Sequence, residues 1–330
     1  MTFATQSFKV VDEQIRLAIP KDLQEQYGVK YVFVPLPKYI VNENIKQVTI
    51  KPSNNDGIKL QIQYETIEVP LTTELNNWAS IDLGIDNLAT LTSNVCKPVL
   101  ISGKPIKSIN RYFNKQIAKE QSKLKKVNGV YTSNNLNTIR TKKANKLEAE
   151  LHKISSFVQE YCQMNEIDTL VIGYNKCWKD KVSLGKRTNQ KFVSIPYTKL
   201  IQYITYKLKL KGINVVIQEE SYTSKCSYFD NEPIKKQSTY NGTRTKRGCF
   251  VTGSGVKINA DVNGSLNITR KFLQKSKVAN DVSLKPVGIG FVMNPVRLNL
   301  DTTTSVACVN KFIINLQIES VKLLKKDNTF

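Results

Sequence analysis

The chain has 330 residues, enough for two domains that each bury a core. Hydrophobic residues make up 40% and charged residues 23%, which excludes an intrinsically disordered protein. No apolar run of the length needed to span a bilayer is present, and the N-terminus lacks the pattern of an export signal. We therefore expect no membrane association and a location inside the cell, in the cytoplasm or the nucleus.

The net charge is the first sign of function. The chain contains 49 Lys and Arg against 27 Asp and Glu, which gives a formal net charge of +22. A charge of this size repels itself and favours a polyanionic partner. Nucleic acid is the leading candidate, while an anionic membrane surface and a basic protein without such a partner are the alternatives.

The pattern of apolar residues changes along the chain. Residues 1–75 alternate apolar and polar positions and predict a β-rich domain with a hairpin turn over 51–57. From about residue 78 to 220, short apolar strands alternate with helical segments, which predicts an α/β domain. Within it, the segment from Ala79 to Thr92 predicts a tight hairpin whose first strand carries one acid, Asp82.

A helical insertion is predicted over residues 104–165. Its periodic apolar residues begin near Ala144, and a polar break over 128–137 suggests two helices joined by a loop. The insertion is strongly basic as far as residue 153. We expect a structural role for its single histidine, His152, which lies beside the apolar stripe.

Helix signals recur in the second half of the chain. Pro196 and Gly212 frame a predicted helix, and Asn259 is expected to cap another that ends near Lys275. Residues 222–257 form a basic excursion without regular periodicity. Residues 276–330 are expected to form a C-terminal tail.

Three acids stand out by their positions. Asp82 sits in an apolar strand, Glu220 ends another strand, and Asp261 falls in the first turn of a helix. Burying an unpaired carboxylate is costly, and a bound cation would remove the cost. Acids from two strands and a following helix suit a pair of Mg²⁺ or Mn²⁺ ions that hydrolyse a phosphodiester. A salt bridge at a sheet edge is the alternative for each acid.

The motif around Asp82 also allows an actin-like ATPase. Such a protein needs a second glycine-rich phosphate loop, which the sequence does not show. A basic surface is also unnecessary for binding ATP. We therefore prefer the nuclease interpretation.

A series of ordered segments resembles the TnpB/OrfB family of insertion-sequence proteins, which has Fanzor-type relatives in viruses and eukaryotes. The similarity extends from about residue 8 to 298. The segments are IDLGIDNLAT (81–90), IGYNKCWK (172–179), FVSIPY (192–197), ESYTSKCS (220–227), YNGTRTKRG (240–248), NADVNGSLNI (259–268) and NPVR (294–297).

The resemblance implies a transposon-encoded, RNA-guided DNA endonuclease, with DNA and a guide RNA as partners. It maps Asp82 and Asp261 onto the first and third carboxylates of a RuvC site. Most relatives carry the second acid where this chain has Gly173, so here we assign it to Glu220. Strand alternation turns the neighbouring Glu219 to the opposite face.

Two departures from the family pattern affect the expected function. Many relatives have a four-cysteine zinc ribbon, but here only Cys226 and Cys249 fall in that region, too few for a tetrahedral zinc site. We expect a degenerate finger without zinc, whose cations bind phosphate or are simply solvated. The chain is also expected to be N-terminally truncated within the β-barrel domain of its relatives. The cations of the finger include Arg244, Lys246 and Arg247.

A basic loop around Trp178 is a second candidate nucleic-acid contact. An indole among cations can stack on a base while the cations hold phosphates. Packing of Trp178 beneath the loop is the alternative. The cations named with it are Lys179, Lys186 and Arg187.

The sequence thus predicts an α/β fold with a RuvC, RNase H-like domain over residues 76–275. This domain includes the helical insertion and the degenerate finger, and an incomplete β-barrel domain over 1–75 precedes it. The predicted function is metal-dependent DNA cleavage linked to transposition and DNA recombination. The alternative is a catalytically silent or truncated nucleic-acid-binding remnant.

Overall fold

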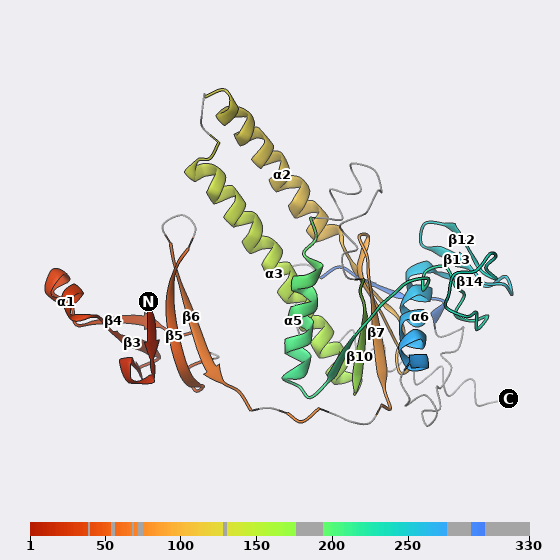
Figure 1. Cartoon of the computed structure of the whole chain (residues 1–330), viewed down its shortest axis with the longest axis horizontal. Helices are drawn as coiled ribbons and strands as arrows, with labels where there is room; N and C mark the ends of the chain where they lie inside the picture. Colours follow the sequence, from red (N-terminus) through yellow and green to blue (C-terminus); the bar gives the residue numbers. More distant parts are fainter. Residues whose placement is uncertain are drawn as a thin grey trace. The chain divides into compact units, whose positions relative to one another are not determined.

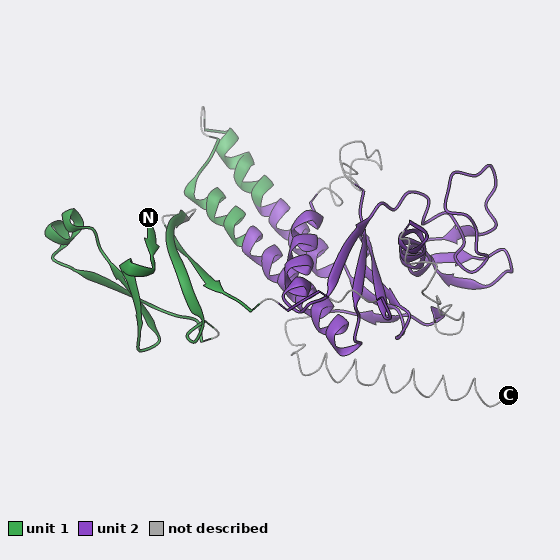
Figure 2. Ribbon diagram, turned by 60° about the horizontal axis from the view of Figure 1, so that its bottom comes forward, with its two compact units in different colours: residues 1–68, 117–142 green, residues 69–116, 143–330 purple. Residues whose placement is uncertain are grey.

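A computed structural model describes residues 1–300, apart from residues 39, 54–56, 68, 72–74, 128–130, 176–193 and 276–291. Contacts divide the chain into two units, one of residues 1–68 with 117–142 and one of residues 69–116 with 143–330 (Figure 2). The domain limits expected from the sequence stay predictions. In the described part of the chain, no helix has the length and apolar character needed to cross a membrane.

The smaller unit contains two three-stranded antiparallel sheets, with orders β1-β5-β6 and β2-β3-β4. Phe3, Ile15, Leu17 and Val48 form its small core. The alternating pattern of the sequence therefore does produce β structure here. The elements are β1 (Thr2–Ala4), η1 (Thr5–Ser7), β2 (Phe8–Val11), β3 (Gln14–Ala18), α1 (Lys21–Tyr27), β4 (Tyr31–Pro35), β5 (Asn44–Ser53) and β6 (Gly57–Glu65).

A six-stranded mixed sheet of order β11-β10-β7-β8-β9-β15 forms the centre of the larger unit (Figure 1). Neighbours β7, β8 and β9 are antiparallel, whereas β10 runs parallel to β7 and β11 runs parallel to β10. The strands are β7 (Trp78–Leu83), β8 (Asn87–Ser93), β9 (Val99–Ser102), β10 (Thr169–Gly173), β11 (Asn214–Gln218) and β15 (Val296–Leu298).

Alternation along β7 gives the sheet two different faces. Ala79 and Ile81 point into the main core, which α3 (Asn134–Met164) and α5 (Tyr197–Lys209) help to form. Ser80, on the other face, bonds to Ser265 of α6 (Ala260–Lys275), with 2.7 Å from its Oγ to the Ser265 carbonyl oxygen. This second face, beneath α6, is the one that receives Asp82.

The helical insertion differs from its prediction at one boundary. Helices α2 (Lys104–Lys125) and α3 lie side by side, as Figure 1 shows, but α3 begins at Asn134 instead of near Ala144. The Ser133 hydroxyl accepts a hydrogen bond of 3.0 Å from the Leu136 backbone N–H, which satisfies the first turn. The predicted polar break was too long because apolar periodicity marks only the half of α3 that packs on the sheet.

The predicted ends of α5 and α6 agree with the structure. Helix α5 follows Pro196, and Gly212 takes a left-handed φ of 72° just beyond the helix. The Asn259 side chain caps α6 by accepting hydrogen bonds from the Asp261 and Val262 backbone N–H groups, at 2.9 and 3.2 Å. The excursion before α6 is more regular than expected, because it contains β12 (Thr243–Lys246), β13 (Cys249–Val251) and β14 (Lys257–Asn259).

Candidate functional site

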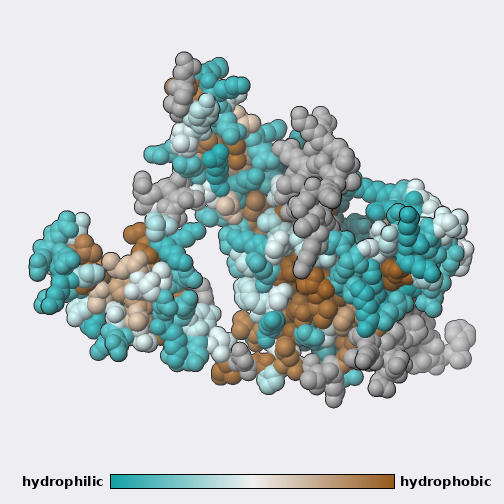
Figure 3. Space-filling model, viewed as in Figure 1, coloured by the Kyte–Doolittle hydropathy of each residue, from teal (hydrophilic) through white to brown (hydrophobic). Residues whose placement is uncertain are grey.

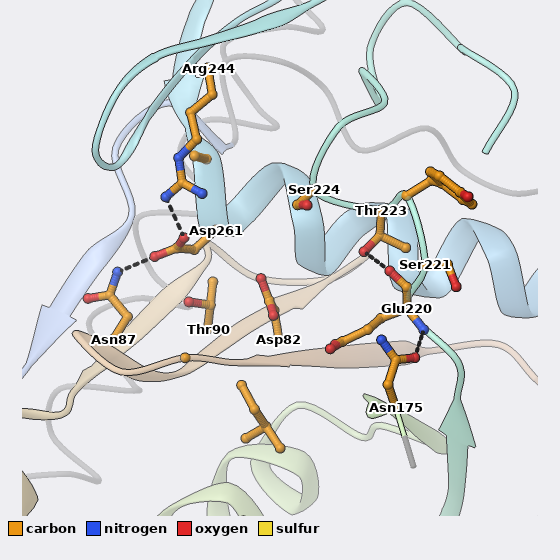
Figure 4. Close-up of a pocket in the computed structure, with 14 residues that line it drawn as sticks. Asp82, Asn87, Thr90, Asn175, Glu220, Ser221, Thr223, Ser224, Arg244 and Asp261 are labelled. Carbon is orange, nitrogen blue, oxygen red and sulfur yellow. Dashed lines mark hydrogen bonds and ion pairs between the residues drawn. The ribbon is translucent and has the colours of Figure 1, made fainter. Parts of the chain in front are cut away.

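A cavity of about 390 Å³ lies beside one end of the central sheet (Figure 4). Asp82 near the end of β7, Glu220 just after β11 and Asp261 in the first turn of α6 all line it. The fold therefore brings together three acids that are far apart in the sequence. The other lining residues are Leu83, Gly84, Asn87, Thr90, Asn175, Ser221, Tyr222, Thr223, Ser224, Arg244 and Ala260.

Two glycines allow the first two carboxylates to approach their neighbours closely. A Cβ atom at Gly264 of α6 would lie 2.8 Å from Oδ2 of Asp82. A Cβ atom at Gly173 of β10 would lie 2.8 Å from Oε2 of Glu220 and would also collide with Cδ1 of Ile268. The Glu220 carboxyl therefore lies beside the backbone of Gly173, the position at which an acid is expected in relatives.

The two adjacent glutamates have opposite surroundings. Glu219 is half exposed and forms an ion pair with Lys271, with 2.5 Å between Oε2 and Nζ. Glu220 lines the cavity, and its backbone N–H donates to Oδ1 of Asn175 at 3.1 Å. The orientations match the alternation predicted for this strand end.

The surroundings of the cavity disfavour the ionised forms of two of the carboxyl groups that line it. Burial, followed by the charges of Glu220 and Asp261, raises the pKa of Asp82 well above its ordinary value. Burial, followed by the charge of Glu219, raises the pKa of Glu220 to about 7. Among the described residues, neither Asp82 nor Glu220 has a cation within ion-pair distance. A positive ion would therefore stabilise both carboxylates in their charged form.

The side chains around the cavity fit a divalent cation in their chemistry. Carboxylates and amide oxygens are the ligands that Mg²⁺ and Mn²⁺ prefer. The buried hydroxyl of Thr90, on the same wall, finds no hydrogen-bond partner among the described residues. This unsatisfied polar atom and the two buried carboxylates make a hydrated cation a suitable occupant.

Asp261 differs from the other two acids because it already has partners. Its carboxylate accepts a 2.7 Å hydrogen bond from Nδ2 of Asn87 and lies 3.6 Å from Nη2 of Arg244. Figure 4 shows it turned toward these two residues. No three His, Cys, Asp or Glu side chains in the described ranges lie close enough together to hold one ion.

The finger hairpin reaches the cavity through two ion pairs, which we call the clasp. Arg244 of β12 contacts Asp261, and Arg247, in the turn after β12, contacts Asp86 in the turn between β7 and β8. Asp86 also binds Lys107 of α2, with 2.5 Å between Oδ1 and Nζ. The third predicted cation of the finger, Lys246, is exposed. The clasp holds β12 beside the carboxylates.

Hydrogen bonds organise the finger where relatives are expected to use a metal. The buried carboxylate of Glu232 accepts bonds from the backbone N–H groups of Ser227 (2.7 Å) and Asn241 (2.9 Å). The guanidinium of Arg270, on α6, donates to the Glu232 carbonyl at 2.5 Å. Cys226 is buried against the Pro233 carbonyl. These contacts fasten the loop to α6 through ordinary polar groups.

Zinc removal is expected to leave the folded protein intact. The finger has two thiols in this region and an internal network around Glu232, so we expect its structure not to require Zn²⁺. Thermal unfolding with and without a strong chelator should give the same midpoint, and elemental analysis should find no stoichiometric zinc. One tightly held zinc ion per chain would contradict this prediction.

The sequence analysis missed several residues of the site. Asn87 holds Asp261, and Asn175 anchors the backbone of Glu220. Tyr197 donates to the Gly84 carbonyl at 2.8 Å, and burial, together with the charges of Asp82 and Glu220, raises its pKa. Asn87 and Tyr197 both lie within the motifs quoted above, but the sequence alone does not show that their side chains lie beside the acids. The candidates Trp178, Lys179, Lys186 and Arg187 fall outside the described residues.

Comparisons with known proteins show what two segments of the chain are similar to. Residues 61–179 match the OrfB_IS605 family model, described as a probable transposase, and residues 197–268 match the TNB domain of Cas12f1-like proteins. The chain is thus similar to TnpB/OrfB proteins over the first of these segments and to Cas12f1-like proteins over the second. The second match includes Glu220, the finger and Asp261, so two of the three cavity acids lie within a segment similar to Cas12f1-like proteins.

Individual TnpB-like and Cas12f relatives add detail. The TnpB-like protein ORF457 of Acidianus two-tailed virus is 28% identical over 223 residues, which are 64% of this chain and 45% of the viral protein. The cryo-EM structure of a Cas12f1–sgRNA–target DNA complex has a TM-score of 0.53 at 16% identity, covering 82% of this chain and 58% of that one. The mixed α/β fold therefore resembles Cas12f, while the chain spans only about half the length of these relatives.

Proposed function

We propose that the larger unit is an RNase H-like, RuvC-type nuclease domain of an RNA-guided DNA endonuclease. The observation that carries this proposal is the convergence of Asp82, Glu220 and Asp261 on one cavity. The sheet supports it, because three antiparallel strands are followed by two parallel ones, and the acids come from its first strand, the end of its last strand and the following helix. This arrangement is the one that the family resemblance predicts.

The three acids would hold two Mg²⁺ or Mn²⁺ ions. When bound, such ions polarise the phosphodiester and supply hydroxide near neutral pH. Asp82 and Glu220 are buried, and the attraction between a carboxylate and a cation is stronger there than at the solvent-exposed surface. Asp261 would complete the set of ligands on releasing Arg244. The guanidinium of Arg244, which lines the same cavity, would then be available to bind a phosphate oxygen of the substrate.

DNA and a guide RNA are the proposed partners. The solved Cas12f1 complex contains an sgRNA and a target DNA, and the present chain shares its fold. The net charge of +22 supports binding to a phosphate backbone. Base pairing by the guide would then choose the target, while this chain holds the backbone and cuts it.

A second candidate function is nucleic-acid binding without cleavage. The contact of Asp261 with Arg244 and Asn87 favours it, because this contact directs one of the three acids away from a shared ion. Cleavage distinguishes the two functions, since both require binding. Titration of Mg²⁺ against cleavage of a DNA target by the full chain with its bound RNA is the deciding experiment.

Binding to nucleic acid is expected to depend steeply on salt. Each phosphate neutralised on a duplex contributes about −0.9 to the slope of log affinity against log salt concentration. Neutralising two phosphates already weakens binding by about tenfold between 50 and 200 mM salt, and the charge of this chain allows more. Fluorescence anisotropy with a labelled duplex measures the slope. Affinity that does not change over this range would contradict both candidate functions.

A further inference from the structure

One buried hydroxyl on the wall of the cavity lacks a hydrogen-bond partner. Thr90 of β8 is fully buried (0% exposed) and lines the cavity, yet its Oγ1 atom meets no donor or acceptor among the described residues. A buried hydroxyl without a partner lowers the stability of a fold. Where such a group occurs in a folded protein, it points to a water, an ion or a chemical role.

Thr90 lies directly opposite the first acid of the site. Strands β7 and β8 pair so that Asp82 faces Thr90, and opposite residues of an antiparallel pair have Cβ atoms about 5 Å apart. In Figure 4 both side chains project from the same side of the sheet, with Thr90 between Asp82 and Asn87. The register of two strands therefore holds this hydroxyl beside the Asp82 carboxyl.

The neighbouring hydroxyls on this face of the sheet are paired. The next pair of opposite residues is Ser80 and Thr92, whose hydroxyl oxygens lie 2.8 Å apart. Each also lies within hydrogen-bond distance of Oγ of Ser265 on α6, at 3.0 and 2.9 Å. We call Ser80, Thr92 and Ser265 the hydroxyl cluster. Thr90 shares the strand, face and burial of Thr92, but it lines the cavity and has no such partner.

We propose that Thr90 is a positioning residue of the metal site, whose hydroxyl gains its partner only when a divalent cation binds. This inference rests on the proposed function for that cation. Metal ligands must be ionised, and Mg²⁺ usually keeps several of its waters, so the loaded site offers oxygens to which the hydroxyl can donate. In Figure 3 the surface over α6 and the finger is mostly hydrophilic, which suits the approach of a hydrated ion.

The test compares two threonine-to-valine substitutions on β8. Thr90→Val removes the unpaired hydroxyl, and the matched control Thr92→Val removes one that belongs to the hydroxyl cluster. Valine keeps the β-branched shape of threonine in both. In chelator, Thr90→Val should unfold at a midpoint equal to or above that of the unaltered chain, because it loses no hydrogen bond. Thr92→Val should unfold at a lower midpoint, because Ser80 and Ser265 each lose a partner.

Added Mg²⁺ should separate the two variants in the opposite sense. For the same rise in unfolding midpoint, Thr90→Val should need about 10 to 100 times more Mg²⁺ than the unaltered chain, the usual cost of losing a group that orients metal ligands. Thr92→Val should respond to Mg²⁺ as the unaltered chain does. Thr90→Ser should do so too, because serine keeps the hydroxyl.

The possible contrary results have different meanings. An unchanged Mg²⁺ requirement in Thr90→Val would overturn the inference and leave the proposed function intact. A lower midpoint of Thr90→Val in chelator would show that the hydroxyl is already paired without the ion, which also overturns it. Weak Mg²⁺ binding by Thr90→Ser would show that side-chain packing and not the hydroxyl supports the ion. If Mg²⁺ has no effect on the unaltered chain, the proposed metal site itself is contradicted.

Discussion

Replacing Asp82 with asparagine is expected to abolish Mg²⁺-dependent cleavage and to leave nucleic-acid binding nearly unchanged. Asparagine has almost the same shape, so the contact of this side chain with Gly264 is kept, while the charge that attracts the ion is lost. Altering a residue that merely supports a metal ligand costs about 10- to 100-fold. Loss of a ligand should reduce the cleavage rate by more than about 100-fold. Single-turnover cleavage and anisotropy in chelator measure the two effects separately.

Glu219→Gln is the matched control for this experiment. The substitution removes the carboxylate charge of the residue next to Glu220. The Glu219 side chain, however, points to Lys271 and away from the cavity. Cleavage by this variant should stay close to that of the unaltered chain. Cleavage by Asp82→Asn within tenfold of the unaltered rate would rule out the carboxylate site. Equal losses in both variants would point to general damage.

The stability of the metal-free protein should fall as the pH rises from about 4.5 to 7. The pKa of Glu220 in the folded protein is about 7, well above its ordinary value of 4.5, so the folded state binds this proton more tightly than the unfolded chain does. The stabilisation is complete below the ordinary pKa and is lost as the pH rises through the raised one. A pKa difference of this size corresponds to about 3 kcal/mol. Urea unfolding in chelator, repeated across this range, measures the loss.

Glu220→Gln should remove the part of this pH dependence that Glu220 contributes, while the pKa of Asp82 stays raised by burial. Above pH 7 the variant should be more stable than the unaltered chain in chelator, because it no longer ionises a carboxyl beside Asp82. Added Mg²⁺ should raise the unfolding midpoint of the unaltered chain and have little effect on the variant. Parallel stability curves for the two proteins would show that Glu220 keeps an ordinary pKa.

Much of the candidate site could be predicted because local sequence determines it. The apolar run around Asp82, the alternation at Glu219 and Glu220, and the Asn259 cap before Asp261 each depend on a few neighbouring residues. These patterns correctly indicated which strand or helix end carries each acid. The family resemblance then brought the three acids into one site, which no local pattern could have done.

The remaining features depend on contacts between distant segments. Nothing near Asn87 or Arg244 in the sequence indicates that both bind Asp261, because tertiary packing brings them together. The same holds for Glu232, whose buried carboxylate organises a loop that has no periodic pattern. The first ten residues of α3 were missed because a Ser133 cap gives no periodic signal and Leu136 is the only buried apolar side chain among them.

The clasp has a thermodynamic consequence. In the proposed function, a divalent cation and Arg244 would compete for the same carboxylate of Asp261, so each would weaken the binding of the other. A phosphate backbone that draws Arg244 away would therefore tighten cation binding. Reciprocity requires that the cation tighten the hold on the backbone by the same factor. Arg244 of the finger would thus act as an internal competitor of the cation. The chain would bind its ions most tightly when nucleic acid is already bound, and the protein free of nucleic acid would bind few of them.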